Sequence, residues 1–222
     1  MAWSFDTANT GITENDTDAT ATLTHVMGTV TNGILFVWVA WSTTATTIST
    51  MTYGAAAMTS AVSHIGTTRN VEIYYLIGPA AGSGTVTINF SGNAGRVTAG
   101  SQSWAGANPT QTPQVNTAHT TSTAPSVTPS TGATELIIDC MAYAFTAGDT
   151  ASVDANQTER GKASGGATMG GSSSQLGSDG GIMSWTLSAS KAWVTCAASF
   201  QSPTSTALTV GGVAQSISAG TV

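Results

Sequence analysis

The sequence predicts an all-β protein, a two-sheet antiparallel jelly-roll-like β-sandwich with a C-terminal arm. Short runs rich in Val, Ile, Thr, Tyr, Phe and Trp recur between clusters of Gly, Pro, Asn and Ser, which is typical of strands and turns. Apolar residues show little of the i, i+3, i+4 spacing of amphipathic helices. The chain of 222 residues is 41% hydrophobic and 7% charged, so it can bury a large core and has few charges for its surface.

The first half of the sandwich starts with a hairpin. Strand runs at residues 20–30 and 34–41 flank Asn32 and Gly33, a pair that readily takes positive φ in a tight turn. Residues 34–41 are apolar at both alternating positions, as expected of a strand covered on both faces at the centre of the core. Further strands are expected at 47–53, 57–63, 70–77, 85–91 and 97–104.

The second half follows a connection at residues 108–132, which is rich in Pro, Thr and Ser and contains one extended edge segment at 115–121. Strand runs resume directly after it, so we interpret the connection as a crossover within one sandwich. About a dozen strands of this length suit a two-sheet jelly roll. The later strands are expected at 135–145, 151–157, 167–176, 182–188 and 193–201.

The expected organisation has three parts: an N-terminal segment at 1–19, a β-sandwich domain at 20–202 and a C-terminal arm at 203–222. The longest and most apolar runs lie in the middle part, so the core is expected there. We expect it to be built around eight side chains: Trp38, Val37, Phe36, Ile73, Tyr75, Ile88, Ile138 and Phe200.

Charge and cysteine content exclude several classes of protein. The net charge is −6, from 11 acidic and 5 basic residues, so no basic stripe is available for nucleic acid. The longest apolar run, at 34–41, is far shorter than the roughly 18 residues of a membrane span. Cys140 and Cys196 lie far apart without a CxxC motif, which argues against a zinc site. Two buried thiols are favoured, and one bridge between two late strands stays open.

The order of the segments resembles a known family. GILFVWVAW follows a strand with Leu-Thr-His-Val, and after it come MTYGAAAM, VEIYYLIGPAAGSGTVTINFSG, SWAGANPTQTP, TELIIDCMAYAFTAG and MSWTLSASKAWVTCAASF. These segments span about residues 20 to 201 and resemble a concanavalin-like jelly-roll β-sandwich domain of unassigned activity. This domain is found in bacteriophage structural proteins and bacterial surface proteins. The resemblance implies a structural or adhesive module and brings no set of catalytic residues.

The function that the resemblance implies is that of a non-enzymatic virion structural protein. It would be a capsid decoration protein or a tail or fibre component, acting through protein–protein contacts with capsid or tail proteins in the virion. A short chain that begins at Met1, lacks a visible leader and is poor in Lys favours this bacteriophage side. The alternative is a carbohydrate-binding or adhesive jelly-roll module, extracellular or on the bacterial cell surface.

The residue types that catalyse reactions are not arranged for catalysis in the sequence. A glycoside hydrolase needs two carboxylates about 5 to 10 Å apart, whereas Glu135 and Asp139 are four residues apart on one strand run. His25, His64 and His119 fall in separate segments without metal-ligand spacing. No GxSxG motif for a nucleophile occurs. We therefore expect no enzymatic activity and no organic cofactor.

One acidic cluster is a candidate calcium site. Glu14, Asp16 and Asp18 place three carboxylates within five residues of a loop, and hard oxygen ligands at alternating positions suit Ca²⁺. The competing interpretation is a solvated acidic turn that keeps a charge-poor protein soluble. Ca²⁺ is the one cofactor that the sequence suggests.

Tryptophans are the signal for the glycan-binding alternative. Trp104 ends a strand before the loop at 106–109, and Trp185 and Trp193 flank a hairpin near Lys191. If the protein is lectin-like, these three rings would form an exposed platform on which a sugar stacks. Because aromatic side chains fill sandwich cores more often, ordinary packing is the competing interpretation.

The C-terminal arm is a candidate partner-binding segment. Leu208, Val210, Val213 and Ile217 alternate with polar residues over a stretch too short to fold alone. We expect the arm to add a strand or lie in a groove on an adjacent subunit. An unpaired hydroxyl-rich edge at 115–121 also favours association. The expected assembly is a homo-oligomer, a trimer or a lattice-bound multimer.

Overall fold

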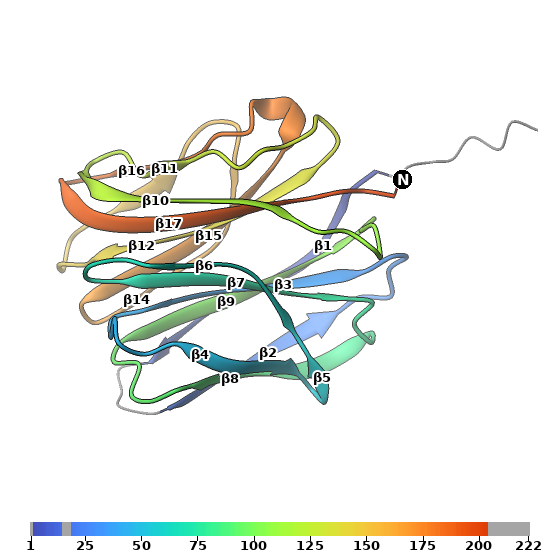
Figure 1. The fold of residues 1–222 in the computed structure, drawn as a ribbon, viewed down its shortest axis with the longest axis horizontal. Helices are drawn as coiled ribbons and strands as arrows, with labels where there is room; N and C mark the ends of the chain where they lie inside the picture. Colours follow the sequence, from blue (N-terminus) through green and yellow to red (C-terminus); the bar gives the residue numbers. More distant parts are fainter. Residues whose placement is uncertain (1, 15–18, 204–222) are drawn as a thin grey trace, which may run out of the picture.

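The computed structural model describes residues 2–14 and 19–203, which form four stacked layers of antiparallel strands (Figure 1). Two five-stranded sheets lie in the middle of the stack, and a smaller sheet covers the outer face of each. The predicted all-β antiparallel sandwich is therefore confirmed. Among the described residues there is no α-helix, and one short 3-10 turn lies at Gly177–Asp179. None of these residues forms a helix with the length and apolarity of a membrane span.

The N-terminal half of the chain builds two of the layers. Inner sheet 1 has the order β1-β9-β3-β7-β6, and outer sheet 1 has the order β2-β8-β4-β5. The strands of inner sheet 1 are β1 (Ser4–Glu14), β3 (Ile34–Trp41), β6 (Thr59–Ile65), β7 (Asn70–Ile77) and β9 (Val97–Ala105). Those of outer sheet 1 are β2 (Thr20–Met27), β4 (Ile48–Tyr53), β5 (Ala56–Ala57) and β8 (Gly82–Phe90).

The C-terminal half builds the other two layers. Inner sheet 2 has the order β10-β17-β12-β15-β14, and outer sheet 2 has the order β11-β16-β13. The strands of inner sheet 2 are β10 (Gln114–Ser122), β12 (Leu136–Ala144), β14 (Thr158–Gly165), β15 (Thr168–Leu176) and β17 (Lys191–Phe200). Those of outer sheet 2 are β11 (Ser126–Val127), β13 (Ala151–Val153) and β16 (Met183–Leu187).

Strand β3 explains why the layers stack. All eight of its residues are buried, because side chains alternate between the two faces of inner sheet 1 and both faces are covered. Its odd-numbered residues, such as Val37 and Trp41, pack against outer sheet 1, and its even-numbered residues, such as Phe36 and Trp38, pack against inner sheet 2. The continuous apolar run seen in the sequence is the centre of the molecule.

Strand β12 plays the same part in inner sheet 2. Ile138 and Cys140 face inner sheet 1, whereas Met141 and Tyr143 face outer sheet 2. Of the eight predicted core side chains, seven are buried. The eighth, Tyr75, is half-buried and packs against the apolar cluster between the two inner sheets. The two cysteines are free and buried, and they lie opposite each other on β12 and β17.

The sequence did not predict the two outer sheets as separate layers, nor the strands β1, β11 and β14. The sandwich begins before residue 20, because Ser4–Glu14 pairs with β9 as an edge strand. Strand β14 lies between the strands expected at 151–157 and 167–176, and it pairs with β15. Strands β1 and β14 contain charged residues and lie at sheet edges. An edge strand is partly open to solvent, so its residues need not follow an apolar pattern.

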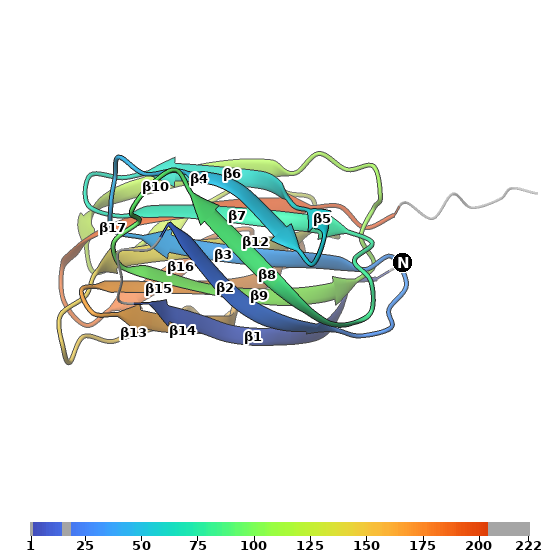
Figure 2. The same ribbon diagram turned by 90° about the horizontal axis from the view of Figure 1, so that it is seen from below.

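The two inner sheets bring their edges together in pairs. Figure 2 shows β6 and β10 along one side of the molecule and β1 and β14 along the opposite side. Each side therefore presents one edge strand from each inner sheet.

Candidate functional site

The three tryptophans proposed as a sugar-stacking platform are buried, at 7% exposure for Trp104, 1% for Trp185 and 6% for Trp193. Each indole nitrogen donates within the protein, to Gln102, Asp139 and Ser122 respectively. The exposed platform of the lectin-like interpretation is therefore wrong at these positions, and the competing interpretation, ordinary packing, is confirmed, because the rings fill the core.

A buried carboxylate lies between inner sheet 2 and outer sheet 2. Asp139 Oδ1 accepts hydrogen bonds from the backbone N–H and the hydroxyl of Ser173, and Oδ2 accepts a bond of 2.7 Å from Trp185 Nε1. Burial raises the pKa of Asp139 to about 7, although these donors act in the opposite direction. Because both oxygens are bonded to protein groups and the residue is fully buried, Asp139 connects two layers.

A second buried polar network joins outer sheet 1 to inner sheet 1. His25 on β2 contacts the hydroxyls of Ser101 at 2.8 Å and Ser103 at 2.9 Å, and the Ser103 hydroxyl donates to Asp6 at 2.8 Å. Burial lowers the pKa of His25, and the charge of Asp6 acts in the opposite direction. In a nucleophilic triad the carboxylate of the acid accepts a hydrogen bond directly from the histidine ring. Here Ser103 lies between them and Ser101 is buried, so the network holds the two sheets together.

Two sets of predicted site residues cannot be placed. Glu14 is the last residue of β1, whereas Asp16 and Asp18, and the side chain of Glu14, lie outside the described residues. The arm residues Leu208, Val210, Val213 and Ile217 lie outside them as well. The candidate calcium site and the arm both stay predictions.

The fold brings together two histidines that lie in separate segments of the sequence. His64 on β6 and His119 on β10 are 55 positions apart, and the Nε2 of His64 lies 3.0 Å from the Nδ1 of His119. The ring centroids are 5.0 Å apart. Burial, and then the neighbouring imidazole, lower the pKa of His64. The pair bridges inner sheet 1 and inner sheet 2 where their uncharged edges meet.

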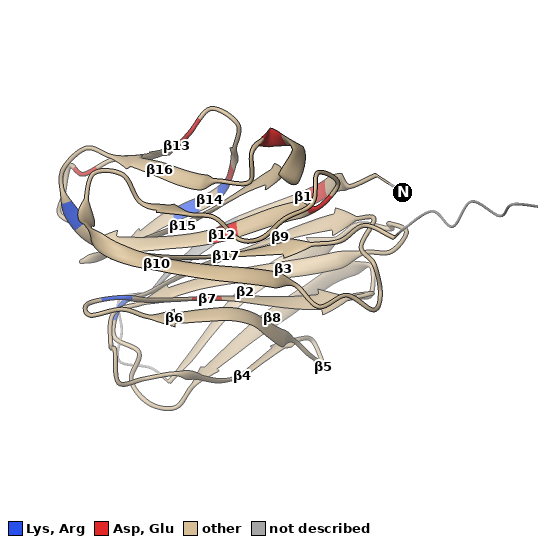
Figure 3. Cartoon of the chain, turned by 45° about the horizontal axis from the view of Figure 1, so that its top comes forward, with Lys and Arg blue, Asp and Glu red and all other residues tan. Residues whose placement is uncertain are grey.

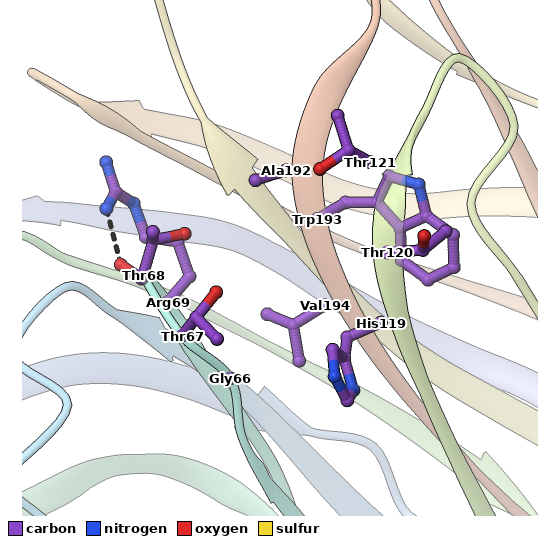
Figure 4. A pocket seen from close by; sticks show the side chains of 10 residues that line it. All are labelled: Gly66, Thr67, Thr68, Arg69, His119, Thr120, Thr121, Ala192, Trp193 and Val194. Atoms are coloured by element: carbon purple, nitrogen blue, oxygen red, sulfur yellow. Dashed lines mark hydrogen bonds between the residues drawn. The ribbon is translucent and has the colours of Figure 1, made fainter.

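Beside His119 lies a small pocket of about 190 Å³ (Figure 4). The turn between β6 and β7 forms one wall with Thr67, Thr68 and Arg69, and β10 and β17 form the other with residues that include His119 and Trp193. The Arg69 guanidinium donates to the carbonyls of Thr68 and Ala167, and it lies on the far side of the pocket from His119 (Figure 4).

On the opposite side of the molecule a second cleft, of about 210 Å³, surrounds Arg160. Its guanidinium stacks on the rings of Phe5 and Trp104, 4.0 and 4.8 Å from their centroids, which is cation–π geometry. Trp3, Asn156 and Asp179 also line this cleft. Its planar polar and aromatic groups are of the kinds that recognise small polar ligands.

The edge strands on the two sides of the molecule differ in charge (Figure 3). Strand β14 carries Glu159, Arg160 and Lys162, and β1 carries Asp6 and Glu14. Strands β6 and β10, the opposite edges of the same sheets, have no Lys, Arg, Asp or Glu. Charged side chains on an edge strand hinder the addition of a further strand. The β10 edge lacks this protection.

Within the described part of the chain, no group of three or more His, Cys, Asp or Glu side chains is arranged to hold a metal ion. Comparison of the chain with protein-family models, with curated proteins and with solved structures gives no match.

Proposed function

We propose that this chain is a non-enzymatic structural component of a virion, a capsid decoration protein or a tail or fibre component. It would associate with copies of itself and with capsid or tail proteins through the side that carries β6 and β10, two edge strands without charged residues. The observation that carries the proposal is the contrast between the two edges of inner sheet 2, with charges on β14 and none on β10.

The β10 edge has the properties of a strand acceptor. It ends inner sheet 2, most of its nine residues are exposed or half-buried Thr, Ser, Asn and Gln, and Val115 is 47% exposed. Neither Pro nor a charged residue interrupts it. Backbone groups on such an edge can pair with a strand from another chain without removing a charge from water.

The C-terminal arm is the proposed occupant of this edge on an adjacent subunit. The last described residues lie beside the start of β10, because Gln201 donates to Gln111 and accepts from Asn108. Nineteen further residues, 204–222, follow. Burial of four alternating apolar side chains supplies on the order of 6 kcal/mol, and the entropy of ordering opposes it with a similar amount. The arm therefore contributes when other contacts already hold the subunits together.

Incorporation into particles tests this function. Purified particles from the virus that encodes the chain should contain it in many copies, and a chain truncated after Pro203 should fold normally but occupy fewer positions. Absence of the full-length chain from particles would reject the virion role. Equal occupancy by the truncated chain would reject the role of the arm.

Glycan binding is a second candidate function, and the cleft around Arg160 is the observation that favours it. The cleft combines Trp3 with the side chains of Asn156, Arg160 and Asp179, which offer hydrogen bonds and an apolar surface to a sugar ring. Binding on a glycan array that is lost in Asn156→Ala and Asp179→Ala, and kept in Thr120→Ala on the opposite side, would support this alternative. A glycan array on which the wild-type chain binds no glycan would contradict this alternative.

A further inference from the structure

The histidine pair at the meeting edges of the inner sheets has the chemistry of a metal site. His64 and His119 come from different sheets, and their facing nitrogens, Nε2 and Nδ1, are 3.0 Å apart. Neutral imidazole nitrogens are the commonest protein ligands of transition-metal ions. In the sequence the histidines fall in separate segments without metal-ligand spacing, whereas the fold places the imidazoles of His64 and His119 side by side.

The distance between the nitrogens fits a single shared ion. Metal–nitrogen bonds of about 2.0 to 2.1 Å to two nitrogens 3.0 Å apart give a nitrogen–metal–nitrogen angle of roughly 95°. That angle is closer to the cis angle of a square-planar or tetragonal site than to a tetrahedral one. Square-planar or tetragonal coordination by nitrogen and oxygen is typical of Cu²⁺ and Ni²⁺.

The strands hold both imidazoles at the rim of a packed core. His119 lies opposite Val194, which is buried between the inner sheets, and His64 follows Val62 by two residues on the same face of β6. Both side chains therefore lie at the outer edge of the seam between the sheets, with His64 half-buried and His119 exposed, and the apolar residues beside them fix their strands. A site built on two packed strands loses little conformational entropy when an ion binds.

We propose that His64 and His119 form a two-histidine binding site for a divalent transition-metal ion, with Cu²⁺ and Ni²⁺ as the best-fitting ions. His64 contributes Nε2 and His119 contributes Nδ1. Without the ion, one of these nitrogens donates a hydrogen bond to the other. The ion takes the place of that proton, and the ring that donated it adopts the tautomer with its proton on its other nitrogen. Two protein ligands leave the remaining positions to water, which agrees with the absence of a third ligating side chain beside the pair among the described residues. The bound ion cross-links β6 to β10. This proposal does not depend on the proposed function.

The test uses the full chain without a polyhistidine tag. Calorimetric titration with Cu²⁺ and with Ni²⁺ should give one strong site per chain. The variants His64→Asn and His119→Asn should each bind at least tenfold more weakly, because loss of even an outer-shell partner costs roughly 10- to 100-fold. Thr67→Ala, in the neighbouring pocket, is the matched control and should bind like the wild type.

Two further measurements keep the proposal falsifiable if a variant folds poorly. Electron paramagnetic resonance of the Cu²⁺-loaded wild type should show coupling to two imidazole nitrogens, and saturating ion should raise the unfolding temperature because it binds the folded seam. Coupling to one imidazole, or variants that bind as tightly as the wild type, would overturn the proposal.

Discussion

The carboxylate of Asp139 on β12 accepts a hydrogen bond of 2.7 Å from the indole Nε1 of Trp185 on β16. Both residues are almost completely buried. This bond therefore ties outer sheet 2 to inner sheet 2 through one polar contact inside an apolar cluster, where an unpaired group is costly.

Replacement of Trp185 by Phe should lower the free energy of unfolding by about 1–3 kcal/mol, because it leaves Asp139 Oδ2 buried without a donor. Trp193→Phe is the matched control, since the indole of Trp193 donates to the neutral, partly buried hydroxyl of Ser122. Urea denaturation measures both variants. An equal loss in the two variants would contradict a special role for the Asp139 contact.

Asp139 should also make stability depend on pH. Burial raises its pKa from 3.8 to about 7, so between these values the folded protein holds a proton that the unfolded chain has released. The stabilising contribution is complete below about pH 4 and is lost as the pH rises through 7, by at most about 1.4 kcal/mol per pH unit. Urea denaturation of the wild type and Asp139→Asn across this range measures it. A difference between the two proteins that does not change with pH would contradict this.

Gly100 should be needed for the close approach of β9 to the core. A Cβ at this position would lie 2.6 Å from ring atoms of the buried Trp38. We expect Gly100→Ala to lower the free energy of unfolding by about 1–3 kcal/mol through overpacking. Gly92→Ala, where nothing lies within 4 Å of the added Cβ, should stay within about 0.5 kcal/mol of the wild type. Thermal unfolding of the pair checks this, and an unchanged Gly100→Ala would refute it.

The thiols of Cys140 and Cys196 should be unreactive in the folded protein. They lie opposite each other, are both free and have no exposed surface, and burial raises the pKa of Cys196. Alkylation should modify neither residue in native buffer and both in denaturant. Rapid labelling of the native protein would contradict the packing of inner sheet 2.

The strands were predictable where both faces of a strand are covered. Residues 34–41 are apolar at both parities and became β3, and residues 135–145, apolar except for Glu135 and Asp139, became β12, at the centres of the inner sheets. Strand β14 was missed because Glu159, Arg160 and Lys162 interrupt its pattern at an exposed edge. The four-layer stack was not predicted because the apolar pattern of a strand indicates that a face of its sheet is covered, but it does not indicate which strands cover that face.

The histidine pair shows the limit of sequence spacing for sites. His64 and His119 meet because β6 and β10 end different sheets that are packed together, a long-range relationship that no local motif encodes. The buried tryptophans illustrate the converse. Trp104 precedes a loop in the sequence, yet it lies beneath Phe5 and Arg160, because the unpredicted strands β1 and β14 cover it.

Light scattering of the full-length chain and of Thr120→Lys tests the proposed assembly most directly. Thr120 is exposed on the β10 edge, and Thr85→Lys is the matched control because Thr85 is also exposed, on β8 between two other strands. We predict that the wild type and Thr85→Lys associate into species of several chains as concentration rises, and that Thr120→Lys shifts to the mass of one chain. A wild type that stays monomeric at every concentration, or a Thr120→Lys variant with the wild-type mass, would contradict association through the β10 edge.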